Sequence, residues 1–394
     1  FLEETLPFMV DSNVAFVQTP QTYGNMHNII SRGAGYMQTM FYRFIQPGRT
    51  EFNAAFCVGT NVLFRRSAVL DIGGMYTQSK SEDVWTSLML HERGWKSIFI
   101  AKTLAVGDAP ETIEAYTKQQ LRWATGGFEI LFTHNPFNPK RQLTLDQRFM
   151  YFVTASFYLT GIAPGILLFV PALEVFFDLH PVNLQVDVFT WFLFYAGFYV
   201  LQILLAALTL GTFRWEVLLL AANSFPIYVR AFLNAFIGVD TKWHVTGTTK
   251  KSSAFNFIIP QVITFVFLIG VAFVSIWRDI NLGMLNVATF WSVINTIAVG
   301  AFIVVAFSEA REKVGTADRT DIDVASATID DEAPALLGLA EITKARQQVQ
   351  LLATAPADQA TDLLEAAPAK AAAPSDSTAP SDPPKRAVDS SDAN

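Results

Sequence analysis

Long apolar segments fill residues 149–308, whereas residues 1–148 mix short strand-like runs with helical patterns of ordinary polarity. A helix needs about 20 mostly apolar residues to cross a bilayer. Five segments approach this length, at residues 149–177, 186–211, 215–237, 254–277 and 286–307. The composition agrees, because only 16% of the residues are charged, against about 25% in soluble proteins. The second zone is therefore predicted to be an α-helical transmembrane domain.

The segment 215–237 differs from the other four because it contains Glu216 and Arg230, and a charge at the centre of a bilayer is costly. If the other four segments span, the basic connections all fall on one side of the membrane. Counting 215–237 as a span would place the basic stretch 242–251 on the opposite side. We therefore predict four spans and an amphipathic helix at the cytoplasmic interface. The N-terminal zone and the C-terminal tail of this multi-pass plasma-membrane protein are then cytoplasmic.

The tail, residues 309–394, is rich in Ala, Pro, Ser and Asp. It carries 8 Lys and Arg against 16 Asp and Glu, so it accounts for the acidity of a chain whose formal net charge is −7. Such a composition buries too little apolar surface to offset chain entropy, and the tail is predicted to be disordered. The body is close to neutral and has no basic block that suggests nucleic acid as a partner.

The N-terminal zone is predicted to be part of an α/β domain. Strand-like runs occur at 14–18, 61–65 and 97–100, and a helix is expected over 82–93, where Gly94 ends it. The zone supplies few strands for a complete domain of this class. A disulfide-stabilised scaffold is excluded, because Cys57 is the one cysteine of the chain.

The run Ser81-Glu82-Asp83 stands at the start of the helix expected over 82–93. Taken alone, it is best explained as a helix cap, in which Ser81 accepts backbone N–H bonds and the two acids complement the helix dipole. The functional alternative is a carboxylate held at a strand-to-helix junction, where it can act as a general base.

A second run, Gln119-Gln120-Leu121-Arg122-Trp123, places Gln119, Arg122 and Trp123 on one face of a helix. A guanidinium suits a phosphate, and an indole face suits a sugar ring or a cation. Taken alone, the run is better explained by an interfacial helix whose Trp and Arg anchor at the lipid headgroups.

Together these runs resemble the processive family 2 glycosyltransferases of the cellulose synthase type. That family carries a Thr-Glu-Asp motif, a Gln-x-x-Arg-Trp motif and an aromatic-Cys-Gly-Ser motif, followed by membrane spans. The matching residues lie in the family's order at Phe56-Cys57 with Gly59, Gly73-Gly74, Ser81-Glu82-Asp83, Gly94-Trp95 and Gln119 to Trp123. The resemblance extends from about Asn13 to Phe307. It implies a partial GT-A-type glycosyltransferase domain in residues 1–148, joined to the transmembrane domain.

The resemblance also assigns roles to the residues. Asp83 corresponds to the catalytic base that deprotonates the acceptor hydroxyl; Glu82 is its neighbour, and Ser81 replaces the usual Thr. The residues that correspond to the binding site for the acceptor end and the nucleotide diphosphate are Gln119, Arg122 and Trp123, with Phe56 and Cys57 where the family contacts the acceptor. A buried Cys57 that packs as a small apolar side chain is the alternative.

The segment 243–251 resembles the family's gating loop, a Phe-x-Val-Thr-x-Lys motif that follows the interfacial helix. Trp243 stands in place of Phe, Thr246 keeps its position, and Lys250 lies two places late. The alternative is a solvated loop with interfacial lysines.

The family's Asp-x-Asp metal motif does not occur in residues 1–148. The resemblance places this motif and the donor-binding half before the region that matches Phe1. We therefore expect that this chain ligates no metal and is inactive alone, and that Mg²⁺ or Mn²⁺ serves the full-length enzyme. No Arg-x-x-x-Arg follows the last span, so the cyclic-di-GMP domain of many bacterial relatives is not expected either.

The implied function is an inverting hexosyltransferase that passes glucose from UDP-glucose to a growing β-glucan. The four spans would extrude the polysaccharide through the lipid bilayer, with Trp191, Phe192 and Trp291 along the path, and the partners would include an accessory export subunit. Two alternatives stay open: a synthase of another polysaccharide, such as chitin, hyaluronan or mannan, and a non-catalytic membrane subunit or transporter.

Overall fold

The computed structural model describes residues 1–179, 188–238 and 254–311. The predicted gating loop, with Thr246 and Lys250, lies outside these ranges, and so does the predicted tail beyond Arg311.

A three-stranded mixed sheet forms the centre of the N-terminal domain. The strand β1 (Val14–Gln18) pairs antiparallel with β3 (Val62–Phe64) and parallel with β4 (Lys96–Phe99), in the order β3-β1-β4. All of β1 is buried, which explains why its apolar residues form a continuous run rather than an alternating one. Each strand agrees with the predicted run to within a residue. A two-stranded sheet pairs β2 (Thr22–Tyr23) with β5 (Val106–Gly107).

Helices make up most of the rest of this domain, and two of them, given below as α5 and α6, carry predicted site residues. They are α1 (Leu2–Thr5), α2 (Ile29–Met40), a π-helical turn (Phe41–Ile45), α3 (Gln46–Glu51), α4 (Arg66–Asp71), α5 (Glu82–Glu92) and α6 (Ile113–Thr133). The predicted helix over 82–93 is confirmed as α5. Gly94 follows it with φ +78°, a left-handed conformation that suits glycine.

The second zone is helical, as predicted. Its helices are α7 (Leu145–Ser156), α8 (Ala163–Phe177), α9 (Val188–Leu210), α10 (Trp215–Asn223), α11 (Phe225–Ile237), α12 (Ile259–Leu282) and α13 (Val287–Arg311). Among the described residues, α12 and α13 are long and apolar enough to cross a membrane. Three bent pairs raise the number of candidate spans to as many as five if each pair counts as one. The four-span topology stays a prediction.

The segment predicted as the first span, 149–177, is a bent pair rather than one helix. The helix α7 begins before it, at Leu145, and α8 leaves it at an angle of 45°. Pro164 explains where α8 starts, because proline suits the first turn of a helix. Tyr228 of α11 crosses the break so closely that a methyl group on Gly161 would lie 2.2 Å from its ring.

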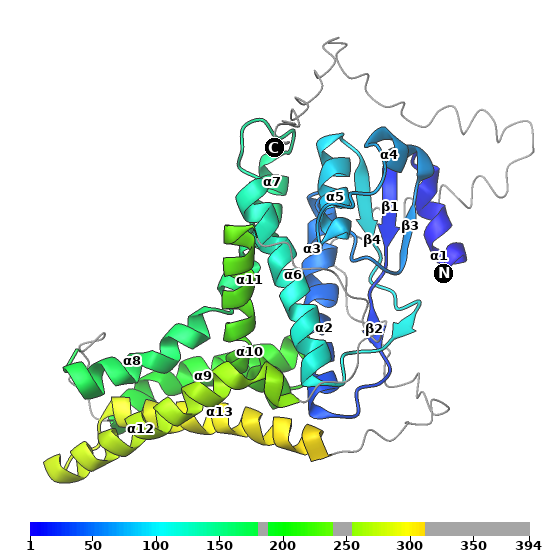
Figure 1. Cartoon of the computed structure of the whole chain (residues 1–394). Helices are drawn as coiled ribbons and strands as arrows, with labels where there is room; N and C mark the ends of the chain where they lie inside the picture. Colours follow the sequence, from blue (N-terminus) through cyan, green and yellow to red (C-terminus); the bar gives the residue numbers. More distant parts are fainter. Residues whose placement is uncertain (180–187, 239–253, 312–394) are drawn as a thin grey trace, which may run out of the picture.

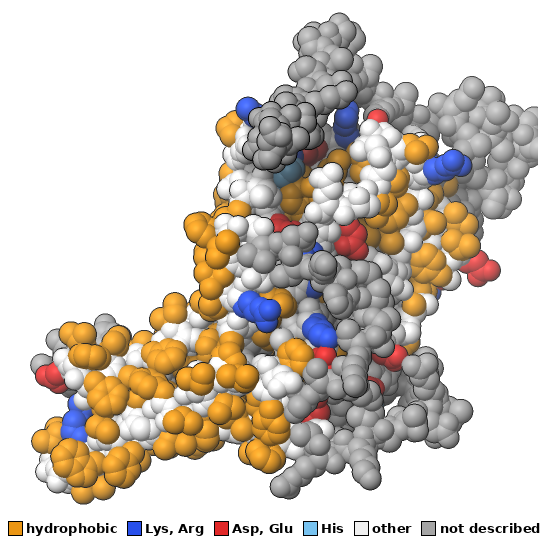
Figure 2. All heavy atoms as spheres, viewed as in Figure 1, with side chains coloured by type: hydrophobic (Ala, Val, Ile, Leu, Met, Phe, Trp, Pro, Cys, Tyr) orange, Lys and Arg blue, Asp and Glu red, His pale blue; other side chains and the backbone are white. Residues whose placement is uncertain are grey.

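The segment 215–237 also divides, into α10 and α11, with a 43° bend at Ser224. In Figure 1, α8, α9, α12 and α13 form an arm that extends to one side, and α7 and α11 run across its direction, along the N-terminal domain. Figure 2 shows the arm covered with apolar side chains. Its surface includes Phe194, Phe273 and Ile280, each more than 70% exposed. This surface favours the membrane prediction, and the orientation of α11 fits the interfacial position predicted for it.

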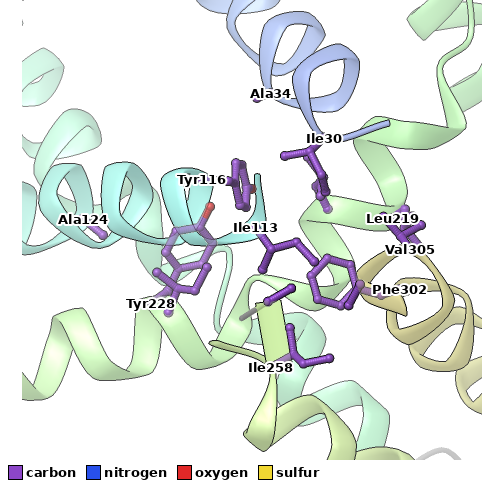
Figure 3. Close-up of a cluster of buried hydrophobic side chains, with 14 of the residues drawn as sticks. Ile30, Ala34, Ile113, Tyr116, Ala124, Leu219, Tyr228, Ile258, Phe302 and Val305 are labelled. Atoms are coloured by element: carbon purple, nitrogen blue, oxygen red, sulfur yellow. The ribbon is translucent and has the colours of Figure 1, made fainter. Parts of the chain in front are cut away.

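One apolar core joins the two zones. Figure 3 shows its side chains converging from α2 (Ile30, Ala34), α6 (Ile113, Tyr116), α10 and α11 (Leu219, Tyr228) and α13 (Phe302, Val305). At its edge, Glu309 near the end of α13 accepts a 2.8 Å hydrogen bond from the backbone N–H of Ile113. The charge complements the N-terminal end of α6, so the last helix of the arm helps to fix the helix that carries Arg122.

Candidate functional site

Asp83 lies in the first turn of α5, where its Oδ1 accepts a 2.8 Å bond from the N–H of Val84. The predicted side-chain cap is wrong: Ser81 accepts no capping bond in the described structure, although Asn28 and Thr144 do so at their helices. Ser81 is instead buried against α6, where a methyl group on Gly126 would lie 1.9 Å from its Oγ. The junction therefore serves helix packing.

A turn after α3 approaches the carboxylate of Asp83 from the other side. Gly59 has φ +79°, and a methyl group on it would lie 3.1 Å from Oδ2 of Asp83. The N–H of Cys57 donates to Oγ of Ser87 at 2.8 Å, and that hydroxyl donates to the carbonyl of Asp83 at 2.8 Å. Glycine suits position 59 for two reasons: the backbone there is left-handed, and a side chain would crowd the Asp83 carboxylate.

Burial raises the pKa of Asp83 to about 6. The neighbouring charge of Glu82, which is exposed, also raises this pKa, whereas the N–H of Val84 and the Arg122 guanidinium lower it. A carboxylate with a pKa near 6 remains ionised at neutral pH and is a better proton acceptor than an ordinary aspartate. The same burial, with the charges of Asp83 and Glu82, raises the pKa of the Cys57 thiol to about 12. The buried, protonated thiol agrees with the alternative that Cys57 packs as a small apolar side chain.

Arg122, which shares a face of α6 with Gln119 and Trp123, lies within electrostatic reach of Asp83, since its charge lowers the pKa of that carboxylate. All three side chains are partly buried. Oε1 of Gln119 is buried and has no hydrogen-bond partner within the described residues. A ligand hydroxyl would satisfy this acceptor, and Arg122 is placed to bind a negatively charged group beside Asp83.

Phe56 and Cys57 are 6% and 1% exposed, so they present little side-chain surface to a ligand. The Phe56 ring packs on Phe41 at 5.5 Å between ring centroids. The adjoining turn is fixed by Gln18, whose amide donates to the carbonyl of Thr60 at 2.7 Å and accepts from Val58 at 3.1 Å. These residues shape the wall that faces Asp83.

Sequence reasoning missed Tyr42, which is on the π-helical turn between α2 and α3. Burial raises the pKa of its hydroxyl, and interactions with Tyr23 and with the charge of Asp83 add to the effect, so Tyr42 lies within electrostatic reach of Asp83. Its ring stacks on Phe99 of β4. A π-helical turn is frequent at functional sites, but the run Phe41–Ile45 carries no pattern that would predict one.

Two further expectations concern a metal ion and the export path. Among residues 1–179, 188–238 and 254–311, no three His, Cys, Asp or Glu side chains form a group that could hold a metal ion. Trp191 and Trp291 pack edge to face at 5.5 Å, and Trp191 is 6% exposed, whereas Phe192 is 51% exposed. Trp191 is thus a buried packing residue in the described structure.

Comparison with known proteins places this arrangement in a family. Residues 1–305 match the family described as "Glycosyl transferase family group 2". The chain belongs to this family. The glycosyltransferase family 2 resemblance inferred from the order of the motifs is confirmed, and the Asp83 and Arg122 region lies inside the match.

Similar curated proteins carry cellulose synthase names. The chain is 33% identical to a UDP-forming cellulose synthase catalytic chain of Dictyostelium discoideum over 178 residues, which cover 42% of this chain and 17% of that protein. It is 32% identical to the UDP-forming catalytic chain of cellulose synthase 1 of Komagataeibacter xylinus over 184 residues, 45% of this chain and 25% of the relative. The corresponding Xanthomonas axonopodis pv. citri protein is 29% identical over 160 residues, 39% and 22% of the two chains. The chain thus spans a quarter or less of these relatives.

Proposed function

We propose that this family 2 glycosyltransferase chain supplies the base and the acceptor side of a processive, inverting hexosyltransferase that extends a β-glucan with glucose from UDP-glucose. The names of the relatives support the donor and the product. The observation that carries the proposal is the carboxylate of Asp83, whose pKa is raised to about 6 beside the Arg122 guanidinium.

The chemistry follows from these two groups. Asp83 takes the proton of the acceptor hydroxyl as the hydroxyl oxygen attacks the anomeric carbon of the donor. The bond from that carbon to the diphosphate oxygen breaks, and the diphosphate leaves with the electron pair. Arg122 stabilises the charge that develops on the leaving group. Attack opposite to the leaving group inverts the anomeric centre. Oε1 of Gln119, which has no partner among the described residues, would accept a hydrogen bond from a sugar hydroxyl.

The exposed apolar surface of the arm supports a location within a lipid bilayer. We propose that its helices α8, α9, α12 and α13 pass through the plasma membrane and guide the product outward, with an accessory subunit to receive it. The catalytic domain then faces the cytoplasm, where nucleotide sugars are made. The arm's highly exposed apolar side chains are the observation behind this part of the proposal.

The proposal is tested by incorporation of labelled sugar in membranes that contain the full-length natural protein. Asp83→Asn should lower the rate by at least about 100-fold, because general base catalysis contributes roughly that much or more. Asp146→Asn is a matched control, since Asp146 occupies the same position in the first turn of α7 and is exposed. Incorporation retained by Asp83→Asn would refute the assignment. Incorporation from UDP-N-acetylglucosamine or GDP-mannose, rather than from UDP-glucose, would favour another polysaccharide.

A further inference from the structure

Arg49 is a buried cation at the junction between the catalytic domain and α7. The residue is 3% exposed, and its guanidinium donates to Oγ1 of Thr154 in α7 at 2.6 and 2.5 Å. It also donates to the carbonyl of Met150 in α7 and, at 3.5 Å, to that of Ala54. None of the ion pairs formed by the described residues includes Arg49.

A buried charge without a counter-ion is costly, and two features of the surroundings offset this cost. Thr154 lies in the last turn of α7, where the helix dipole favours positive charge. The face of the Phe56 ring lies 5.0 Å from the guanidinium carbon of Arg49, within the range of a cation–π interaction. Burial lowers the pKa of Arg49 to about 10, so the side chain stays charged at neutral pH.

Hydrogen bonds connect Phe56, which contacts Arg49, to the backbone of Asp83. Gln46 fixes the Phe56 backbone twice, because its amide donates to the carbonyl at 2.8 Å and accepts from the N–H at 3.3 Å. The next residue, Cys57, is joined through Ser87 to the backbone of Asp83 by two bonds of 2.8 Å. An unbroken series of contacts therefore leads from α7 to the start of α5.

A second contact ties the other end of α5 to α7. His91 forms a 2.7 Å hydrogen bond with the hydroxyl of Tyr151 in α7 and one of 2.8 Å with Oγ of Ser97 in β4. Burial and the charge of Arg49 lower the pKa of His91 to about 3, so this bond is made by a neutral imidazole. The helix that carries Asp83 is thus held to α7 at both ends.

We propose that Arg49 is a positioning residue for sugar transfer: it fixes the turn at Phe56 and Cys57, and with it the base on α5, onto α7, the helix that leads into the apolar arm. This inference rests on the proposed function. In a processive enzyme the acceptor end must return to the same place beside the base after each addition. The base is on α5 and the path of the product is on the arm, and Arg49 sets the distance between them.

The first test uses the sole thiol of this chain as a reporter. Cys57 is 1% exposed beside Phe56, so N-ethylmaleimide should label it slowly in the folded, detergent-solubilised chain. Arg49→Met and Thr154→Val should each raise the labelling rate by about tenfold or more, because the turn opens locally. Arg66→Met, at an exposed arginine, should not. Leu268→Ala, which removes a fully buried side chain from α12, is the control for general destabilisation. An unchanged rate in Arg49→Met, or an equal rise in Leu268→Ala, overturns the proposal.

The second test measures the reaction in membranes with the full-length natural protein. Arg49→Met should shorten the product several-fold, while the KM for the nucleotide sugar stays unchanged. Arg49→Lys should not restore the product length, because a lysine side chain has a single nitrogen and cannot donate from two nitrogens to Oγ1 of Thr154. Products of normal length at normal rates per folded molecule would overturn the positioning role. Absence of incorporation by the unmodified protein would instead refute the proposed function, and the labelling test would still decide the role of Arg49 in fixing the turn.

Discussion

Replacement of Asp83 by Asn should stabilise the protein at neutral pH while it abolishes transfer. The folded pKa of Asp83 is raised from 3.8 to about 6. Stability from this group is therefore fully present below pH 3.8 and is lost as the pH rises through 6. A shift of about 2 pKa units corresponds to roughly 3 kcal/mol, at 1.36 kcal/mol for each unit. Asparagine has no charge to bury and keeps an oxygen for the N–H of Val84, so most of this cost should disappear.

The measurement is the melting temperature of the detergent-solubilised chain between pH 7.5 and 4.5. Asp83→Asn should raise it by several degrees at pH 7.5, since each kcal/mol corresponds to about 2–4 °C. The difference should shrink as the pH falls through 6. The control Asp146→Asn should lower the melting temperature slightly at pH 7.5, because it removes a favourable charge–dipole interaction of about 0.3–1 kcal/mol. A decrease in Asp83→Asn like that of the control would refute the reasoning, because the carboxylate would then not be destabilised by burial.

Three further substitutions give distinct results. Arg122→Gln removes a charge that lowers the pKa of Asp83, so the acid limb of the pH–rate profile should move above pH 6; a limb that stays in place would contradict this. Gly59→Ala should reduce transfer by at least about tenfold, because φ is +79° and the new methyl would contact the Asp83 carboxylate. Gly126→Ala should lower both activity and melting temperature, by about 1–3 kcal/mol of stability, since its methyl overlaps Ser81. Gly48→Ala, with no atom within 4 Å of the methyl, is the neutral control for both glycines.

Periodicity predicted the elements that carry the site. The buried run 14–18, the helix that begins at Glu82 and the helical face with Arg122 all form as expected. These features depend on local sequence, because a buried strand is continuously apolar and a helix repeats every 3.6 residues. The order of the motifs led to the family, and the match over residues 1–305 confirms it.

Long-range packing decided what the sequence could not predict. Serine is a residue type typical of helix caps, but the Ser81 side chain packs against Gly126 of α6 instead of accepting a capping bond. Residues 149–177 are mostly apolar, and the 45° bend after α7 occurs where Tyr228 and Phe225, far away in the sequence, pack against Gly161 and Gly165. A buried arginine such as Arg49 has no local signature, because its acceptors on α7 lie about 100 positions further along the chain.

The pH dependence of sugar transfer tests the central claim, that Asp83 is the base, most directly. The rate of labelled glucose incorporation at saturating UDP-glucose would be measured from pH 8 to 4.5 with the full-length natural protein, after preincubation at each pH has confirmed that no activity is lost irreversibly. Asp83 must be ionised to accept a proton, so the rate should fall below a midpoint near pH 6, about tenfold for each further pH unit. A rate that stays constant from pH 7.5 to 5 would contradict the account.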